Sequence, residues 1–117
     1  MSQFPHDMVN PEERLRETLL RTSASKFVFM TFTSEWCAPC KNLYKSLKKW
    51  YKKNSDDVHV LIIDVAKYPT ITQQFDVQGV PTLVVVRNNA IVHRRAGIYS
   101  HGHLKTLLKE SKKKFRH

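Results

Sequence analysis

The stretch 26–53 constrains the fold of this 117-residue chain more than any other part of its sequence. It opens with a run of aromatic and β-branched residues, 26–33, which predicts a buried strand. A loop with both cysteines of the chain, Cys37 and Cys40, leads from this strand into a helical pattern over 39–53. The first cysteine is therefore predicted to lie at a strand-to-helix junction.

The helical pattern over 39–53 is amphipathic. Its apolar stripe consists of Cys40, Leu43, Leu47, Trp50 and Tyr51, and lysines fill the other face. A second apolar run, 58–64, follows it and contains four consecutive aliphatic residues, 60–63. Such a run favours a strand buried on both faces, as in a parallel sheet. The sequence thus predicts two buried strands joined by a crossover helix.

A further helix is predicted before this unit, from 11 to about 22. Asn10 suits the N-cap, Pro11 suits the first helical position, and acidic residues fill the first turn. Its apolar stripe consists of Leu15, Leu19 and Leu20. We expect these leucines to pack on the sheet.

The C-terminal half predicts a short helix over 68–75 and a hairpin of the strands 82–87 and 91–96. The strands are joined by Asn88-Asn89-Ala90, where asparagine tolerates positive φ. Ser100 is the predicted cap of a final helix. The inward residues of that helix are Leu104, Leu107, Leu108 and Phe115.

The elements follow the order α-β-α-β-α-β-β-α. We predict an α/β fold with a central mixed sheet of about four strands and helices on both faces. The length fits a single domain, 1–117, with 1–9 as a flexible N-terminus and 112–117 as a basic C-terminal end.

The composition, 41% hydrophobic with mixed charge, is that of a globular protein. The N-terminus lacks the basic and apolar regions of a secretory signal. The apolar runs are far shorter than the roughly 20 residues that a membrane helix needs. We therefore expect a cytoplasmic monomer that does not engage a membrane. In a reducing compartment, a close pair of cysteines is more often catalytic or metal-binding than structural.

The net charge of +10 comes from two segments. Residues 41–53 hold six lysines and no acid, and residues 101–117 hold six basic side chains and one acid. Alternating helix placement puts both segments on one side of the sheet, where they form a lysine-rich face. This face could attract an acidic protein or nucleic acid, although a charged helix face is more often simply solvated.

The Cys37–Cys40 pair carries the chemistry. A CxxC at a helix start places the first sulfur beside unpaired backbone N–H groups and the positive end of the helix dipole, which lower the pKa of its thiol. Cys37 is therefore predicted to attack a substrate disulfide, and Cys40 to resolve the mixed disulfide that forms. Pro39 fixes φ in the first helical turn without losing an intrahelical hydrogen bond.

Half of a zinc site and two inert thiols are the alternatives for the cysteines. A structural zinc site needs four ligands, but there is no second CxxC and the six histidines have no ligand spacing. Redox chemistry is therefore favoured. We expect no cofactor or metal beside the redox-active disulfide.

The segment 26–108 resembles thioredoxin. The run 36–41, Trp-Cys-Ala-Pro-Cys-Lys, matches the active-site run of that family. The segment 77–83, Val-Gln-Gly-Val-Pro-Thr-Leu, is similar to the family's segment with a cis-proline. The segment 97–100 resembles the loop before the family's last helix, and Asp64 matches the acid that ends its second core strand.

The resemblance implies a thioredoxin fold, a protein-disulfide oxidoreductase activity, protein disulfides as substrates and a thioredoxin-reductase-like electron donor. It also implies a cis-proline at Pro81 beside Cys37, and a backbone at Val80 that binds a substrate strand. The substrate-binding residues that it implies are Trp36, Ala38, Pro39, Val80 and Gly97.

The chain departs from the family at four positions. Thr31 replaces a buried acid and Val60 replaces the lysine that commonly accompanies it. Without that acid as a general base, we expect slower or more pH-sensitive turnover. Thr33 replaces a frequent tryptophan, and Ala38 replaces a usual glycine. We expect these two substitutions to affect which substrates and partners the protein binds.

Two functions follow from these residues. The first is a thioredoxin-type thiol–disulfide oxidoreductase that uses Cys37 and Cys40. The alternative is a binding module of the same fold, whose lysine-rich face docks on an acidic protein or nucleic-acid assembly.

Overall fold

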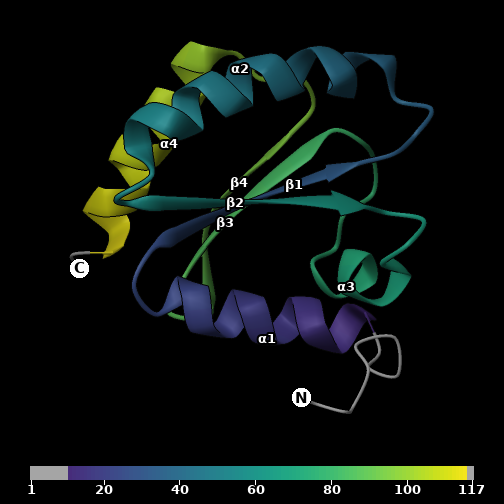
Figure 1. Cartoon of the computed structure of the whole chain (residues 1–117), viewed down its shortest axis with the longest axis horizontal. Coiled ribbons are helices and arrows are strands. Elements are labelled where there is room, and N and C mark those ends of the chain that lie inside the picture. Colours follow the sequence, from purple (N-terminus) through teal and green to yellow (C-terminus); the bar gives the residue numbers. More distant parts are fainter. Residues whose placement is uncertain (1–10, 116–117) are drawn as a thin grey trace.

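The structure is a computed structural model that describes residues 11–115. A four-stranded sheet with the order β2-β1-β3-β4 forms its centre (Figure 1). The elements are α1 Pro11–Ser23, β1 Phe27–Thr33, α2 Ala38–Asn54, β2 Val58–Asp64, α3 Pro69–Gln74, β3 Thr82–Arg87, β4 Ala90–Ala96 and α4 His101–Phe115. Their order confirms the prediction. The predicted cap Asn10, the segment 1–9 and residues 116–117 lie outside the described residues.

β1 is an inner strand that pairs with β2 in parallel and with β3 in antiparallel orientation. The β1–β2 register runs without a shift from Phe27 opposite Val58 to Thr33 opposite Asp64. β3 and β4 form the antiparallel hairpin. The sheet is therefore mixed, as predicted.

Two residues, Asn88 and Asn89, connect β3 to β4. Their φ angles are +53° and +60°, in the left-handed region that asparagine tolerates better than most residues. Positive φ at both positions is typical of the turn whose twist matches that of a hairpin. Arg87 pairs with Ala90, so Ala90 begins β4 and does not belong to the loop.

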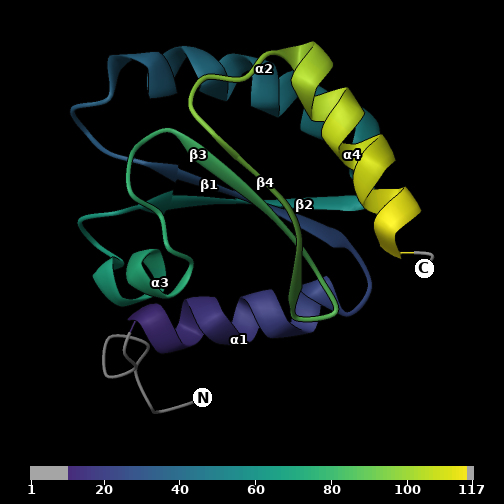
Figure 2. The same cartoon turned by 180° about the vertical axis from the view of Figure 1, so that it is seen from behind.

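The helices cover both faces of the sheet. In Figures 1 and 2, α2 and α4 lie above the sheet and α1 and α3 lie below it. Successive side chains of β1 alternate between the two cores: Phe29 packs on the α2 side with Trp50, and Met30 packs on the α1 side with Leu19. Along residues 11–115, no helix has both the length and the apolar character needed to cross a bilayer.

Three burial predictions are wrong. Phe115, predicted to face inward from α4, is 40% exposed at the end of that helix, although its ring contacts Phe27. β2 is an edge strand rather than a strand buried on both faces, and Ile62 is 53% exposed. An unbroken aliphatic run indicates a strand but does not give its place in the sheet, because that place depends on pairings made elsewhere. Leu20 of α1 is also 53% exposed, since Leu15 and Leu19 already fill the side that faces the core.

A carboxylate from α1 caps the short helix α3. Glu12 Oε1 accepts hydrogen bonds from the backbone N–H groups of Thr70 at 2.8 Å and Ile71 at 3.2 Å. Hydrogen bonding to Thr70 holds the pKa of Glu12 below its ordinary value. Because Tyr68 at the N-cap supplies no side-chain cap, α1 supplies the missing acceptor.

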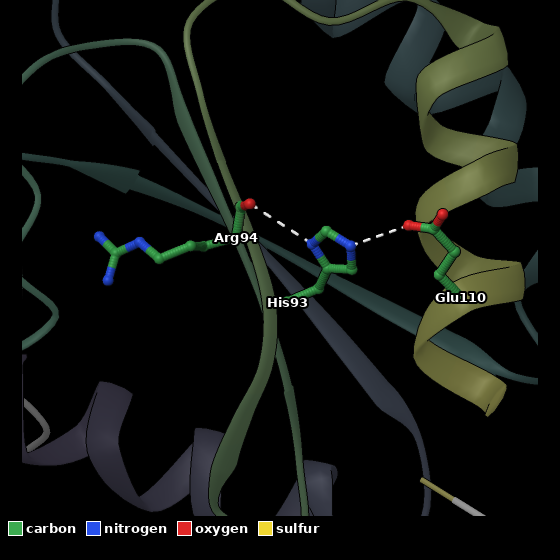
Figure 3. A network of polar contacts seen from close by, with 3 residues as sticks. All are labelled: His93, Arg94 and Glu110. Atoms are coloured by element: carbon green, nitrogen blue, oxygen red, sulfur yellow. Dashed lines mark hydrogen bonds and ion pairs between the residues drawn. The ribbon is translucent and has the colours of Figure 1, made fainter. Parts of the chain in front are cut away.

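Neighbouring side chains of β4 reach opposite layers. Figure 3 shows His93 between the carbonyl of Arg94 and Glu110 of α4, with His93 Nε2 at 2.9 Å from Glu110 Oε1. Arg94 points the other way and donates to the carbonyls of Phe75 at 2.9 Å and Asp76 at 3.0 Å, just after α3. These hydrogen bonds connect β4 to α4 on one face of the sheet and to the residues just after α3 on the other.

Candidate active site

The cysteine pair lies at the N-terminus of α2, as the sequence predicts. Cys37 is the N-cap, with extended backbone angles (φ −89°, ψ 93°), and Cys40 lies in the first turn. The two sulfurs form a disulfide, and the two Cα atoms are 5.3 Å apart. Ala38 and Pro39 lie between them at the start of the helix, and both are exposed.

Backbone groups of α2 favour negative charge on the first sulfur. The N–H of Cys40 donates to Cys37 Sγ at 3.2 Å, as donors at a free helix end do to a capping side chain. The first turn contains no acidic residue, so no carboxylate within the helix start neutralises the positive end of the helix dipole. Since this donor approaches Cys37 and not Cys40, the environment distinguishes the two sulfurs.

The surface around the pair contains the other residues that the resemblance singles out. Trp36 is 90% exposed and lines a hollow of about 520 Å³ together with Val80. The Val80–Pro81 peptide bond is cis, as the resemblance implies. The N–H of Gly97 donates to the Pro81 carbonyl at 2.9 Å, and these residues line an adjoining hollow with Val80. Val80 joins the two hollows.

A buried hydroxyl pair occupies the place of the expected acid. Thr31 is 3% exposed, and its Oγ1 lies 2.9 Å from the hydroxyl of Tyr99, which is 2% exposed. Burial raises the pKa of Tyr99, and nearby Tyr44 raises it further, while the hydrogen bond to Thr31 acts in the opposite direction. Val60, in the place of the family's lysine, packs against the apolar core of the α2 side. Sequence reasoning missed Tyr99, since its partner is 68 residues away.

The remaining singled-out residues support the loops. Asp64 Oδ1 accepts from the N–H of Ala66 at 2.8 Å, so this acid shapes the turn after β2. Thr33 is buried, at 6% exposure, and lines a small hollow beside Tyr44. Within residues 11–115, no three His, Cys, Asp or Glu side chains gather as a metal ion would require.

The fold and the cysteine geometry are those of known thioredoxins. The thioredoxin family profile matches residues 8–110. Thioredoxin-1 of Drosophila yakuba is 32% identical over 82 residues, which cover 70% of this chain and 77% of that protein. The mitochondrial thioredoxin of Mus musculus is 29% identical over 83 residues, covering 71% of this chain and 50% of that protein.

A solved structure agrees with these relatives. The crystal structure of the germline-specific thioredoxin Deadhead from Drosophila melanogaster superposes with a TM-score of 0.77 at 28% identity and covers 86% of this chain and 95% of that chain. These matches, with the disulfide-forming pair, favour an oxidoreductase over a binding module that makes no use of its cysteines. The chain belongs to the thioredoxin family and is a thioredoxin-like thiol–disulfide oxidoreductase.

Proposed function

We propose that the protein reduces disulfide bonds of other proteins, with Cys37 as the nucleophile and Cys40 as the resolving thiol. The Cys37 thiolate attacks one substrate sulfur, which forms a mixed disulfide and releases the other substrate sulfur as a thiolate. The Cys40 thiolate then attacks Cys37 Sγ and releases the second substrate thiolate. The substrate gains two electrons, and the two protons lost by the cysteines balance those that it takes up.

The hydrogen bond from the Cys40 N–H to Cys37 Sγ carries this assignment of roles. It stabilises a thiolate at Cys37, the sulfur that must attack first. The exposed indole of Trp36 and the hollows at Val80 and Pro81 offer an adjoining surface for the substrate chain. As in the family, Val80 would bind that chain through its backbone, with Ala38, Pro39 and Gly97 at the rim.

The oxidised pair must be reduced again for turnover. We propose a reductase of the thioredoxin-reductase type as the electron donor, and no cofactor other than the Cys37–Cys40 disulfide itself. The proposed setting is the cytoplasm, where a monomer of this kind would take part in electron transport and redox homeostasis.

Insulin reduction tests the activity, and the redox potential tests its direction. With NADPH and a thioredoxin reductase, we expect the protein to accelerate insulin precipitation. Equilibration with glutathione buffers should give a potential at or below about −230 mV, the range of good reductants. A potential near that of the oxidant DsbA, about −120 mV, would instead assign the protein to disulfide formation.

The threonine at position 31 should limit the second step. Cys40 must lose a proton before it attacks, and Thr31 provides no carboxylate to accept it. We expect Thr31→Asp to increase insulin turnover about tenfold near neutral pH and to flatten its pH dependence. Thr31→Asn is the matched control, because it has a similar shape and no charge. An equal rate in both variants and the wild type would refute a proton-transfer limit.

A further inference from the structure

The two edges of the sheet are protected differently. β4 is interrupted by a register shift against β3 and carries His93, Arg94 and Arg95. β2 contains no proline, lysine or arginine, and its polar residues are His59 near its start and Asp64 at its last position. It pairs with β1 along its whole length without a shift. Edge strands that have no charge in their middle, no proline and no bulge readily accept another strand. In the part of the chain that the structure describes, β2 is thus an unprotected edge.

An apolar groove runs beside this edge. It has a volume of about 470 Å³ and lies between α2 and β2. Its lining consists of Tyr44, Leu47, Lys48, Tyr51, Val60 and Ile62. Aromatic and aliphatic side chains around an open groove favour binding of an apolar side chain, and Ile62 remains 53% exposed beside it.

The groove continues to the redox site. Tyr44 and Ile62 also line the neighbouring hollow, which contains Glu35. Glu35 in turn lines the hollow that holds Trp36 and Val80. A chain bound at the cysteines can therefore extend along one continuous surface to the β2 edge.

The charge of α2 indicates which chain would fit. Its lysines are all exposed: Lys41, Lys45, Lys48, Lys49, Lys52 and Lys53. Within residues 11–115, none of them takes part in an ion pair or a side-chain hydrogen bond, whereas Lys112 of α4 is paired with Asp57. The lining of the groove contains Lys48 and no acid, whereas toward the redox end Lys41 and Lys67 lie beside the acids Glu35 and Asp64. The far end of the surface is therefore complementary to acidic residues.

We propose that the β2 edge and its groove dock an extended, acidic segment of a redox partner protein. The segment would add a strand to β2, place an apolar side chain between Tyr44, Tyr51 and Ile62, and set its carboxylates against the lysines of α2. That the partner protein is a disulfide substrate rests on the proposed reductase function. The docking itself does not involve the cysteines.

A short cysteine-free peptide of alternating Glu and Val tests the docking. It is titrated into the full-length, isotope-labelled oxidised protein, and backbone amide shifts are followed by NMR. We expect saturable shifts along β2 and the inner face of α2, and an affinity that falls as salt is added. A peptide of alternating Lys and Val should not bind. Because insulin reduction is measured separately, loss of docking and loss of the reductase activity are distinguishable.

Matched variants locate the site. Ile62→Asp should weaken the peptide about tenfold or more, whereas Ile91→Asp, at a position on β4 with similar exposure, should change its affinity less than about twofold. Lys48→Glu should weaken binding about threefold or more, and Lys113→Glu on α4 should have little effect.

Four results would overturn the proposal. Shifts confined to β4 or α4 would place the peptide elsewhere. Binding that appears only after residues 2–10 are deleted would assign the edge to the chain's own N-terminal segment. Concentration-dependent shifts at β2 without peptide would assign it to a second copy. Oligodeoxythymidylate could bind more tightly than the peptide, with an affinity that Ile62→Asp does not change. That result would assign the lysines of α2 to nucleic-acid binding.

Discussion

Cys37→Ser is expected to abolish insulin reduction, with a loss of at least about 1000-fold in turnover. A serine hydroxyl remains protonated near neutral pH and does not attack a disulfide as a thiolate does. In this variant the N–H of Cys40 would donate to a neutral hydroxyl oxygen, so it would no longer stabilise an anionic nucleophile. The measurement is the rate of insulin precipitation with NADPH and a thioredoxin reductase.

Cys40→Ser is the matched control because it makes the same replacement of sulfur by oxygen at the other cysteine of the pair. Its Cys37 can still attack, but nothing resolves the mixed disulfide. We therefore expect one substrate molecule to become attached per protein, visible as an added mass that dithiothreitol removes. If the Cys37 variant traps substrate and the Cys40 variant does not, the two roles must be exchanged.

The cysteine site could be predicted because its determinants are local. A strand pattern, a CxxC and an amphipathic helix follow one another in 26–54, and the structure confirms their order and the position of Cys37 at the helix start. The hairpin turn at Asn88 and Asn89 is local in the same sense, since positive φ depends on the residue itself. Side-chain periodicity likewise indicated which faces of α2 and α4 are buried.

The features that were missed depend on contacts between distant segments. Glu12 caps α3 from 58 residues away, and no local pattern marks it as a cap. β2 is as aliphatic as an inner strand, but its place in the sheet depends on β3 pairing with the other side of β1. Thr31 lies in β1 and Tyr99 follows β4, so their contact depends on the pairing of β1 with β3 and of β3 with β4.

The buried Thr31–Tyr99 pair leads to the second large effect, on stability. Tyr99→Phe removes one hydroxyl and leaves Thr31 Oγ1 without its partner at 3% exposure, which should lower the free energy of unfolding by about 1–3 kcal/mol. Thr31→Val should cost a similar amount by orphaning the Tyr99 hydroxyl. The double variant should cost at least about 1 kcal/mol less than the sum, because it leaves no unpaired buried hydroxyl.

Urea unfolding of the oxidised protein measures this cycle. Tyr51→Phe is the control, since Tyr51 is only partly buried at the core edge, and it should change the unfolding free energy by less than about 0.5 kcal/mol. Additive losses in the double variant would show that the two hydroxyls do not stabilise each other, and that each variant acts through packing alone.

The same pair predicts an alkaline effect of known sign. Burial raises the pKa of Tyr99 above its ordinary value of 10.0, so at high pH the unfolded chain loses this proton before the folded protein does. The stabilisation is complete below about pH 10 and falls as the pH rises from there toward the folded pKa. Tyr99→Phe removes this component, so its deficit relative to the wild type should shrink above pH 10. A constant deficit between pH 8 and 11 would mean that the folded environment does not favour the neutral phenol.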